Sequence, residues 1–168
     1  MITPTWALTI AYWMHMLATV VWIGGLAVLT LLVIPAARRT LDDNAYAGIL
    51  EKVQQRLDPL AWFSVLVLLG SGMLQMSANP NYQGFLAVNN QWAGAIFGKH
   101  IIFGLMVITS GIITWGIMPS MRRAALRKSR GQDVPEIASL QRREWLLLRL
   151  NLALGIIVLA LTALARAS

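Results

Sequence analysis

Four long apolar stretches dominate the sequence, at about residues 5–36, 59–76, 95–118 and 145–164. A helix needs roughly 20 mostly apolar residues to cross the hydrocarbon core of a bilayer, so each stretch is a candidate membrane span. Only 12% of the residues are charged, whereas an ordinary soluble domain has about 25%, so much of the surface must be apolar and face lipid. We therefore predict an all-α integral membrane protein, a four-helix bundle that forms a single transmembrane domain over residues 1–168.

The basic residues predict how this bundle lies in the membrane. Eleven of the 14 Lys and Arg residues lie in two connections, between the first and second spans and between the third and fourth. The intervening segment, residues 77–94, has no charged residue. Short loops rich in Lys and Arg stay in the cytoplasm, so we predict a multi-pass protein of a bacterial-type inner (plasma) membrane with both termini outside. The net charge of +7 then follows from topology, and we expect no nucleic-acid partner.

The first basic connection, residues 40–57, has a helical pattern of its own. A short amphipathic helix on the membrane surface is expected there, because apolar residues recur at helical spacing. Asp42 or Asp43 would cap its N-terminus. The apolar residues are Tyr46, Ile49, Leu50 and Val53.

The absence of cysteine and the placement of the acidic residues exclude several kinds of site. The chain has no cysteine, which excludes disulfides, zinc–thiolate sites and iron–sulfur clusters. All seven acidic residues lie in or beside the two basic connections, and no carboxylate pair lies within a predicted span. This placement argues against a transporter built on buried carboxylates.

The two histidines, His15 and His100, both lie inside predicted spans. An ionisable side chain in the membrane is costly and is a functional-site hypothesis by default. The first and third spans run in the same direction, and the depths of the two histidines differ by under about 10 Å. Two imidazoles on facing helices suit the axial positions of a b-type haem. We therefore predict haem b between these spans, with His15 and His100 as ligands to the iron.

The neighbours of each histidine fit such a pocket. Gly104 and Gly111 follow His100 on the same helical stripe and would leave a groove for a flat macrocycle. Thr19 and Trp22 follow His15 at i+4 and i+7 and would add a polar group and an aromatic wall.

Two basic side chains and a structural alternative complete this interpretation. Lys99 and Arg166 lie near the outer ends of the third and fourth spans, where they would pair with the haem propionates. Membrane histidines also hydrogen-bond between helices, and glycines let helices pack closely, so the same residues fit a bundle without a cofactor.

Methionines favour a second interpretation, a copper site. Met14 and Met16 flank His15, and Met73 and Met76 lie near the outer end of the second span. Thioether and imidazole ligands suit Cu(I). Adjacent residues on a helix diverge by about 100°, however, so Met14, His15 and Met16 cannot all face one ion, and methionine is also a common core filler. One methionine would equally replace a histidine as a haem ligand.

The stretch from His15 to Leu26 reads HMLATVVWIGGL and is followed by Pro35 and Arg38. It resembles the first span of the copper-resistance D (CopD-like) membrane family, and it is similar to the four-helix, haem-binding protoporphyrinogen oxidase family of bacteria. The CopD-like pattern continues through about residue 125. Its further parts are Arg56-Leu-Asp-Pro-Leu-Ala61, Gly70, Gly72, Gly98-Lys99 and Pro119.

The resemblance implies a four-helix membrane bundle that holds haem b or handles copper. His15 matches the family's first-span histidine, and Lys99 matches the third-span lysine; in the oxidase family these two residues are tied to haem binding and activity. His100 is not part of that pattern. The first span reads Leu26-Ala-Val-Leu-Thr where the oxidase family continues with Leu-Tyr-x-x-Arg.

The main functional prediction is a membrane b-type haem protein that carries out electron transfer, as a redox subunit or a quinol-linked oxidoreductase. Its expected partners are the lipid bilayer and a quinol or another membrane redox protein, either as a chain acting alone or in a homo- or hetero-oligomer. The alternatives are copper import or handling through the outer-half His and Met residues, and a cofactor-free structural subunit of a membrane complex. The sequence identifies no catalytic residue.

Overall fold

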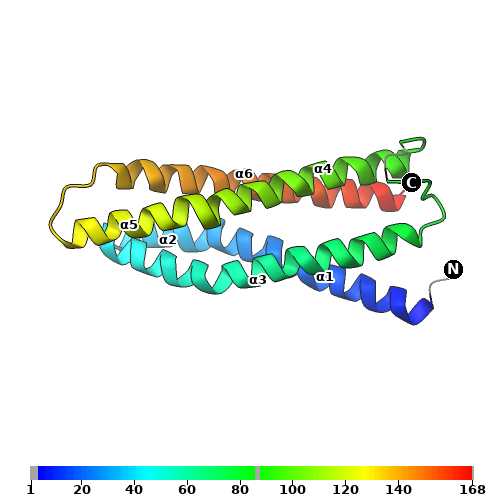
Figure 1. Cartoon of the computed structure of the whole chain (residues 1–168), viewed down its shortest axis with the longest axis horizontal. Helices are drawn as coiled ribbons and strands as arrows, with labels where there is room; N and C mark the ends of the chain where they lie inside the picture. The colour runs from blue at the N-terminus through cyan, green and yellow to red at the C-terminus, as the bar shows by residue number, and fades with distance from the viewer. Residues whose placement is uncertain (1–3, 86–87, 168) are drawn as a thin grey trace.

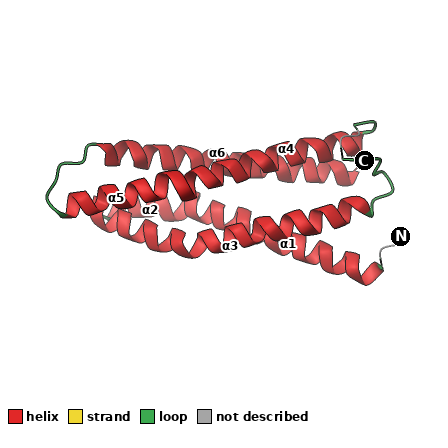
Figure 2. Cartoon of the chain, in the orientation of Figure 1, coloured by secondary structure: helices red, strands yellow, loops and turns green. Residues whose placement is uncertain are grey.

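The computed structural model describes residues 4–85 and 88–167, and in these residues it contains helices and no strand (Figures 1 and 2). Four of its helical segments are long and apolar enough to cross a membrane, and we number them as the first to fourth spans. They are Thr5–Thr40, Ala45–Ser77, Gln91–Ser129 and Glu136–Ala167. The prediction of an all-α, multi-pass architecture is confirmed, although each span is longer than expected.

The first and third spans share an internal irregularity. The first consists of α1 (Thr5–Val28), a π-helical turn η1 (Leu29–Val33) and α2 (Ile34–Thr40). The third consists of α4 (Gln91–Gly111), a π-helical turn η2 (Ile112–Ile117) and α5 (Met118–Ser129). Each π turn ends two residues before a proline, Pro35 or Pro119. A proline ring collides with the carbonyl four residues earlier, and a wide π turn at that carbonyl accommodates it.

The second span is the single helix α3, which begins at Asp43 and runs through Pro59 to Ser77. Asp42 caps it, since its carboxylate accepts a hydrogen bond from the Ala45 N–H at 2.8 Å. One of the two predicted caps is thereby confirmed. The separate surface helix predicted for residues 40–57 is wrong, because this segment is the first part of α3 (Figure 1).

The physical reason for that correction lies in the packing of the same apolar residues. Tyr46 and Leu50 are buried against the other spans rather than laid on a lipid surface. Their cluster holds residues of all four spans, among them Leu26, Ile117 and Leu148. The basic connections are correspondingly shorter than expected, because helix continues through most of them.

The spans associate as two neighbouring pairs. α1 packs along α3, and α4 packs along α6 (Glu136–Ala167), the helix that forms the fourth span (Figure 1). α1 begins and α6 ends at the same end of the bundle, where the α3–α4 connection also lies; we call it the terminal end. The opposite end, where the two Lys- and Arg-rich connections lie, is the basic end. Large apolar side chains such as Trp6, Val20 and Leu66 are exposed along the bundle, as expected of a surface that faces lipid.

Candidate functional site

His15 lies on α1 and faces α3. Its Nδ1 is 2.9 Å from Ser71 Oγ, and Ser71 Oγ donates its own proton to the Val67 carbonyl oxygen. Since a serine hydroxyl has one proton, Ser71 must accept the hydrogen bond from Nδ1–H of His15. Nε2 of His15 therefore keeps a lone pair, which is the state an imidazole needs to bind a metal.

The backbone of α3 leaves room for this ring. A Cβ added to Gly72 would lie 3.4 Å from Cε1 of His15, so the imidazole sits close against the glycine. One turn further, Nε2 of Gln75 donates to the Ala11 carbonyl oxygen of α1 at 3.1 Å. From sequence, Gly72 enters as part of the CopD-like pattern, and Ser71 and Gly72 together indicate only close helix packing. A hydroxyl and a glycine side by side in an otherwise apolar span were the available signal.

His100 has different partners. Its Nδ1 donates to the Ile96 carbonyl oxygen of the same helix at 2.7 Å, and its ring meets Phe85 edge to face at 5.2 Å between centroids. In the neutral form of this ring, Nε2 of His100 is then the nitrogen that carries the lone pair. The two histidines thus turn to separate neighbours, α3 for His15 and the α3–α4 connection for His100.

Lys99 and Arg166 join His15 in the terminal half of the bundle. The Lys99 ammonium is close enough to His15 and to Arg166 for the charges to interact. The Arg166 guanidinium lies over the Tyr12 ring at 5.7 Å. No acidic residue occurs between Pro59 and Gln132. Neither the second nor the third span therefore brings a carboxylate into this half, where Lys99 and Arg166 are basic.

The structure gives the residues predicted to line a haem pocket separate neighbours, and the haem site itself stays a prediction. The two imidazoles have different hydrogen-bond partners. A Cβ on Gly111 would lie 3.2 Å from Trp115, which stacks on Trp62 at 4.7 Å between ring centroids, so the expected groove is occupied. Gly104 has open space beside it.

The two predicted pocket residues on α1 serve the helix and the core. Thr19 Oγ1 donates to the His15 carbonyl oxygen of its own helix at 2.8 Å. Trp22 is buried, as expected of a wall, but it packs edge to face on Phe103 of α4 at 5.5 Å between ring centroids. Neither contact requires a cofactor.

The four methionines proposed as copper ligands do not converge. Met14, Met16 and Met73 are exposed on the outside of the bundle. Met76 is buried, in a cluster with Trp92, Ala95 and Ala165. In the described ranges 4–85 and 88–167, no group of three or more His, Cys, Asp or Glu side chains could hold a metal ion.

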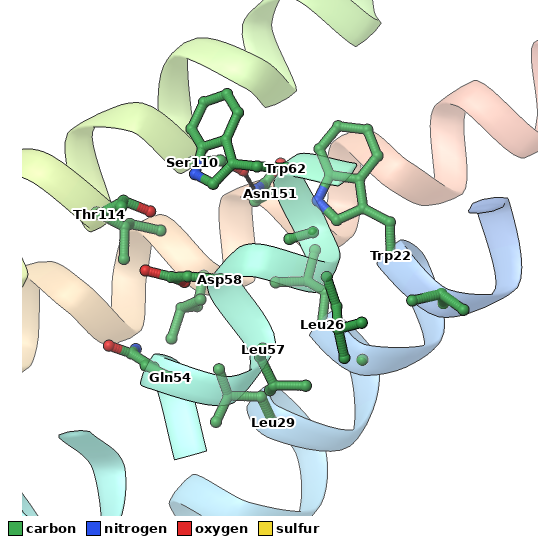
Figure 3. A pocket seen from close by; sticks show the side chains of 16 residues that line it. Trp22, Leu26, Leu29, Gln54, Leu57, Asp58, Trp62, Ser110, Thr114 and Asn151 are labelled. Atoms are coloured by element: carbon green, nitrogen blue, oxygen red, sulfur yellow. Dashed lines mark hydrogen bonds between the residues drawn. The ribbon is translucent and has the colours of Figure 1, made fainter. Parts of the chain in front are cut away.

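A second polar region lies deeper in the bundle and was missed by sequence reasoning. A cavity of about 70 Å³ is lined by residues from all four spans. Figure 3 shows its polar side chains, with the Asp58 carboxyl pointing toward Thr114. Leu29 of η1 and Thr114 of η2 place both π turns at its wall. The polar lining residues are Gln54, Asp58, Ser110, Thr114 and Asn151.

Glu144 extends this region toward the basic end. It is fully buried, at 0% exposure, and its Oε1 accepts a hydrogen bond from Gln54 Nε2 at 2.6 Å. Arg38 of α2 is close enough for its charge to act on Glu144, while its guanidinium also donates to the Gln141 carbonyl oxygen at 3.1 Å. The sequence places Asp58 and Glu144 beside the basic connections, and the structure carries both inside the bundle because α3 and α6 begin several turns before the predicted spans. Asp58 and Glu144 immediately precede the predicted starts of those spans.

The fold places this chain in the class of multi-pass membrane proteins, with four long helices and polar groups inside the bundle. Residues 51–165 match the model of a family described as copper resistance protein D. The match covers about two thirds of the chain, and the protein belongs to this family. Lys99, Asp58 and Glu144 lie inside the matched range, whereas His15 precedes it. No curated protein and no solved structure matches the chain, and the predicted relation to the protoporphyrinogen oxidases stays a prediction.

Proposed function

We propose that the protein handles copper in the membrane, with His15 Nε2 as a ligand that Cu(I) meets in the terminal half of the bundle. The observation that carries this proposal is membership of the copper resistance protein D family over residues 51–165. Copper is here a substrate that passes through or is held for transfer. An imidazole whose other nitrogen is held by a hydrogen bond suits this role, because the second partner orients the ring and fixes its tautomer.

Met76 is the second soft ligand in this proposal. It is the one buried member of the four methionines considered, and it follows Gly72 by four residues on α3, so the two lie on the same side of that helix. Gly72 contacts the His15 ring. The Met76 backbone lies about 6 Å along α3 from the point where that helix meets His15, and its side chain packs with Trp92, Ala95 and Ala165. Thioether with imidazole selects Cu(I) over hard cations.

Lys99 and Arg166 favour transfer over storage. Both are cationic and near the imidazole or near each other, so they oppose the retention of a further positive charge. A conducting site must bind its ion strongly enough to admit it and weakly enough to release it. The proposed site is accordingly a stage in copper movement.

The test is Cu(I) retention by the purified protein in competition with a chromogenic chelator. His15→Ala is expected to weaken Cu(I) binding by at least about tenfold, since removal of even an orienting partner costs 10–100-fold at metal sites. His100→Ala is the matched control, because it removes the same ring from the same half of the bundle and should leave binding within about twofold. Equal losses in the two variants, or no Cu(I) binding by the unaltered protein, would refute the proposal.

We also propose that the basic connections face the cytoplasm and that both termini lie outside, on the distribution of Lys and Arg. Since the chain has no cysteine, single cysteines can report on this directly. With a membrane-impermeant maleimide applied to whole cells, Asn81→Cys should be labelled and Ser129→Cys should not. Labelling in the opposite pattern would invert the topology.

Haem-based electron transfer is the second candidate function, and the free Nε2 atoms of His15 and His100 favour it. A visible spectrum of the purified protein, oxidised and then reduced with dithionite, tests it. A Soret band and a sharp reduced α-band that are lost in either His→Ala variant would support this function. A colourless protein from haem-replete cells would remove it.

A further inference from the structure

The cavity between the four spans presents oxygen atoms that have no donor to match them. Gln54 and Asn151 are each 2% exposed. Nε2 of Gln54 donates to Glu144 at 2.6 Å, and Nδ2 of Asn151 donates to Ser110 Oγ at 2.8 Å. Their carbonyl oxygens, Oε1 and Oδ1, are buried without a hydrogen-bond partner. Buried acceptors left in this state are costly, so the arrangement requires a donor or a cation.

The charges around the cavity also favour a bound cation. Asp58 lines it, and Glu144 lies next to it through Gln54. Arg38 is the basic group that acts on Glu144, and the 16 lining residues include no Lys, Arg or His. Two carboxyl groups thus share one guanidinium, so the ionisation of both would leave a single negative charge uncompensated in a medium of low dielectric constant. A monovalent cation would balance it.

We propose that this cavity binds a small hard monovalent cation, with Na⁺ as the representative ion. The ligands are the Asp58 carboxylate, the free amide oxygens of Gln54 and Asn151, and the hydroxyls of Ser110 and Thr114. Hard cations take carboxylate, carbonyl and hydroxyl oxygens. Cu(I) prefers sulfur and imidazole nitrogen, and neither lines the cavity. This site is therefore separate from the proposed copper site and does not depend on it.

The size and the backbone of the cavity fit this ligand. A volume of about 70 Å³ has room for one ion with a few waters, since a single water needs roughly 10–15 Å³. Both π turns reach the cavity, through Leu29 and through Ile113 and Thr114. Such turns recur at functional sites because they disrupt the regular helical hydrogen bonds and redirect side chains.

The test measures Na⁺ binding by the full-length protein in detergent. Equilibrium dialysis with radioactive Na⁺ should give about one ion per chain, and NaCl should raise the thermal unfolding midpoint relative to choline chloride at equal ionic strength, in a saturable manner. If Na⁺ neither binds nor stabilises, the cavity holds water alone and the proposal is overturned. Stabilisation by acid without any Na⁺ dependence would assign the charge balance to a proton and would also overturn it.

Three variants locate the ion. Asp58→Asn should raise the Na⁺ dissociation constant by at least about tenfold, and Thr114→Val, which keeps the shape of the side chain, should raise it severalfold. Asp133→Asn is the control, since this carboxylate is exposed in the second basic connection, and it should leave binding unchanged. Thr114→Val decides the question if Asp58→Asn does not fold. Unchanged Na⁺ affinity in Thr114→Val and in any folded Asp58→Asn protein would show that the ion binds elsewhere.

Discussion

The terminal half of the bundle and the cavity region toward the basic end have opposite chemistry. The terminal half holds His15, His100, Lys99 and Arg166, and the second and third spans bring it no carboxylate. The cavity region holds Asp58 and Glu144, with amide and hydroxyl oxygens around them. Nitrogen and sulfur donors at one level and oxygen donors at the other select different cations. One small bundle can thus keep two kinds of ion apart along its axis.

The two halves also differ in how their polar groups are satisfied. At the terminal end, His15 and His100 each use Nδ1 in a hydrogen bond and leave only Nε2 available. Toward the basic end, several buried atoms have no partner, among them Gln54 Oε1, Glu144 Oε2 and Asn151 Oδ1. The first pattern is a set of oriented single ligands. The second leaves buried acceptors without a partner, together with the donor Gln141 Nε2 and the hydroxyls of Tyr46 and Thr30.

The largest effect is expected from Glu144→Ala. This change removes a fully buried side chain and leaves both polar atoms of the Gln54 amide without a partner, so the protein should lose about 3 kcal/mol of unfolding free energy. Denaturant titration of the purified protein followed by circular dichroism measures it. Glu136→Ala, at the exposed start of the same helix, should change stability by less than about 0.5 kcal/mol. A loss below about 1 kcal/mol for Glu144→Ala would mean that water already reaches Gln54, and the contrast between the halves would weaken.

Gly72→Leu should break the terminal half alone. A Cβ at this position already comes within 3.4 Å of the His15 ring, so the larger side chain should displace the imidazole from Ser71 and cost about 1–3 kcal/mol by overpacking. Gly70→Leu is the matched control, because nothing lies within 4 Å of its Cβ position, and the better helix propensity of Leu should make it neutral or stabilising by up to about 1 kcal/mol. Thermal unfolding and Cu(I) retention together report both effects. Equal behaviour of the two variants would contradict the packing described for His15.

The architecture was predictable from sequence because each span contains a long apolar run, and such a run forms a spanning helix whichever helices it packs against. The ends of the spans were not predictable from sequence. An apolar run stops at a charged residue, whereas a helix continues until its backbone hydrogen bonds end. Asp58 and Glu144 show the consequence: each comes directly before a predicted span, yet α3 and α6 carry them into the bundle. Buried carboxylates of this kind are recognised only once their partners from other spans are known.

The contacts of the predicted site residues could be predicted only in part, for a related reason. Spacing showed which residues share a helix face, as with His15 and Thr19. It did not show which helix that face packs against. Depth along the membrane placed His15 opposite His100, whereas the structure pairs α1 with α3 and α4 with α6. The actual partner, Ser71, comes from a residue type too common in membrane helices to stand out.

Ser71→Ala tests the hydrogen bond between Ser71 and His15 in the terminal half, and its effect should be smaller. The His15 Nδ1–H loses its acceptor, which should cost about 1 kcal/mol in stability and weaken Cu(I) binding by about tenfold through the loss of ring orientation. Ser64→Ala is the control, since Ser64 also donates to a carbonyl of its own helix, that of Leu60, but contacts no histidine. Chelator competition measures the affinity, and an equal change in both variants would show that Ser71 acts only within its helix.

The smallest effect, and the one that separates the two candidate functions, is expected from Lys99→Gln. The Lys99 charge acts on His15 and opposes a cation there, so its removal should strengthen Cu(I) binding by about two- to fivefold, the equivalent of roughly 0.5–1 kcal/mol for one partly solvated charge interaction. If the terminal half instead binds an anionic group such as a haem propionate, the same variant should lose that ligand and its visible absorbance. Arg149→Gln, an exposed side chain whose guanidinium lies over Trp145 at 4.4 Å, controls for the loss of a positive charge elsewhere in the spans. The direction of the change in Cu(I) affinity therefore decides whether the basic groups of the terminal half repel a passing cation or hold an anion.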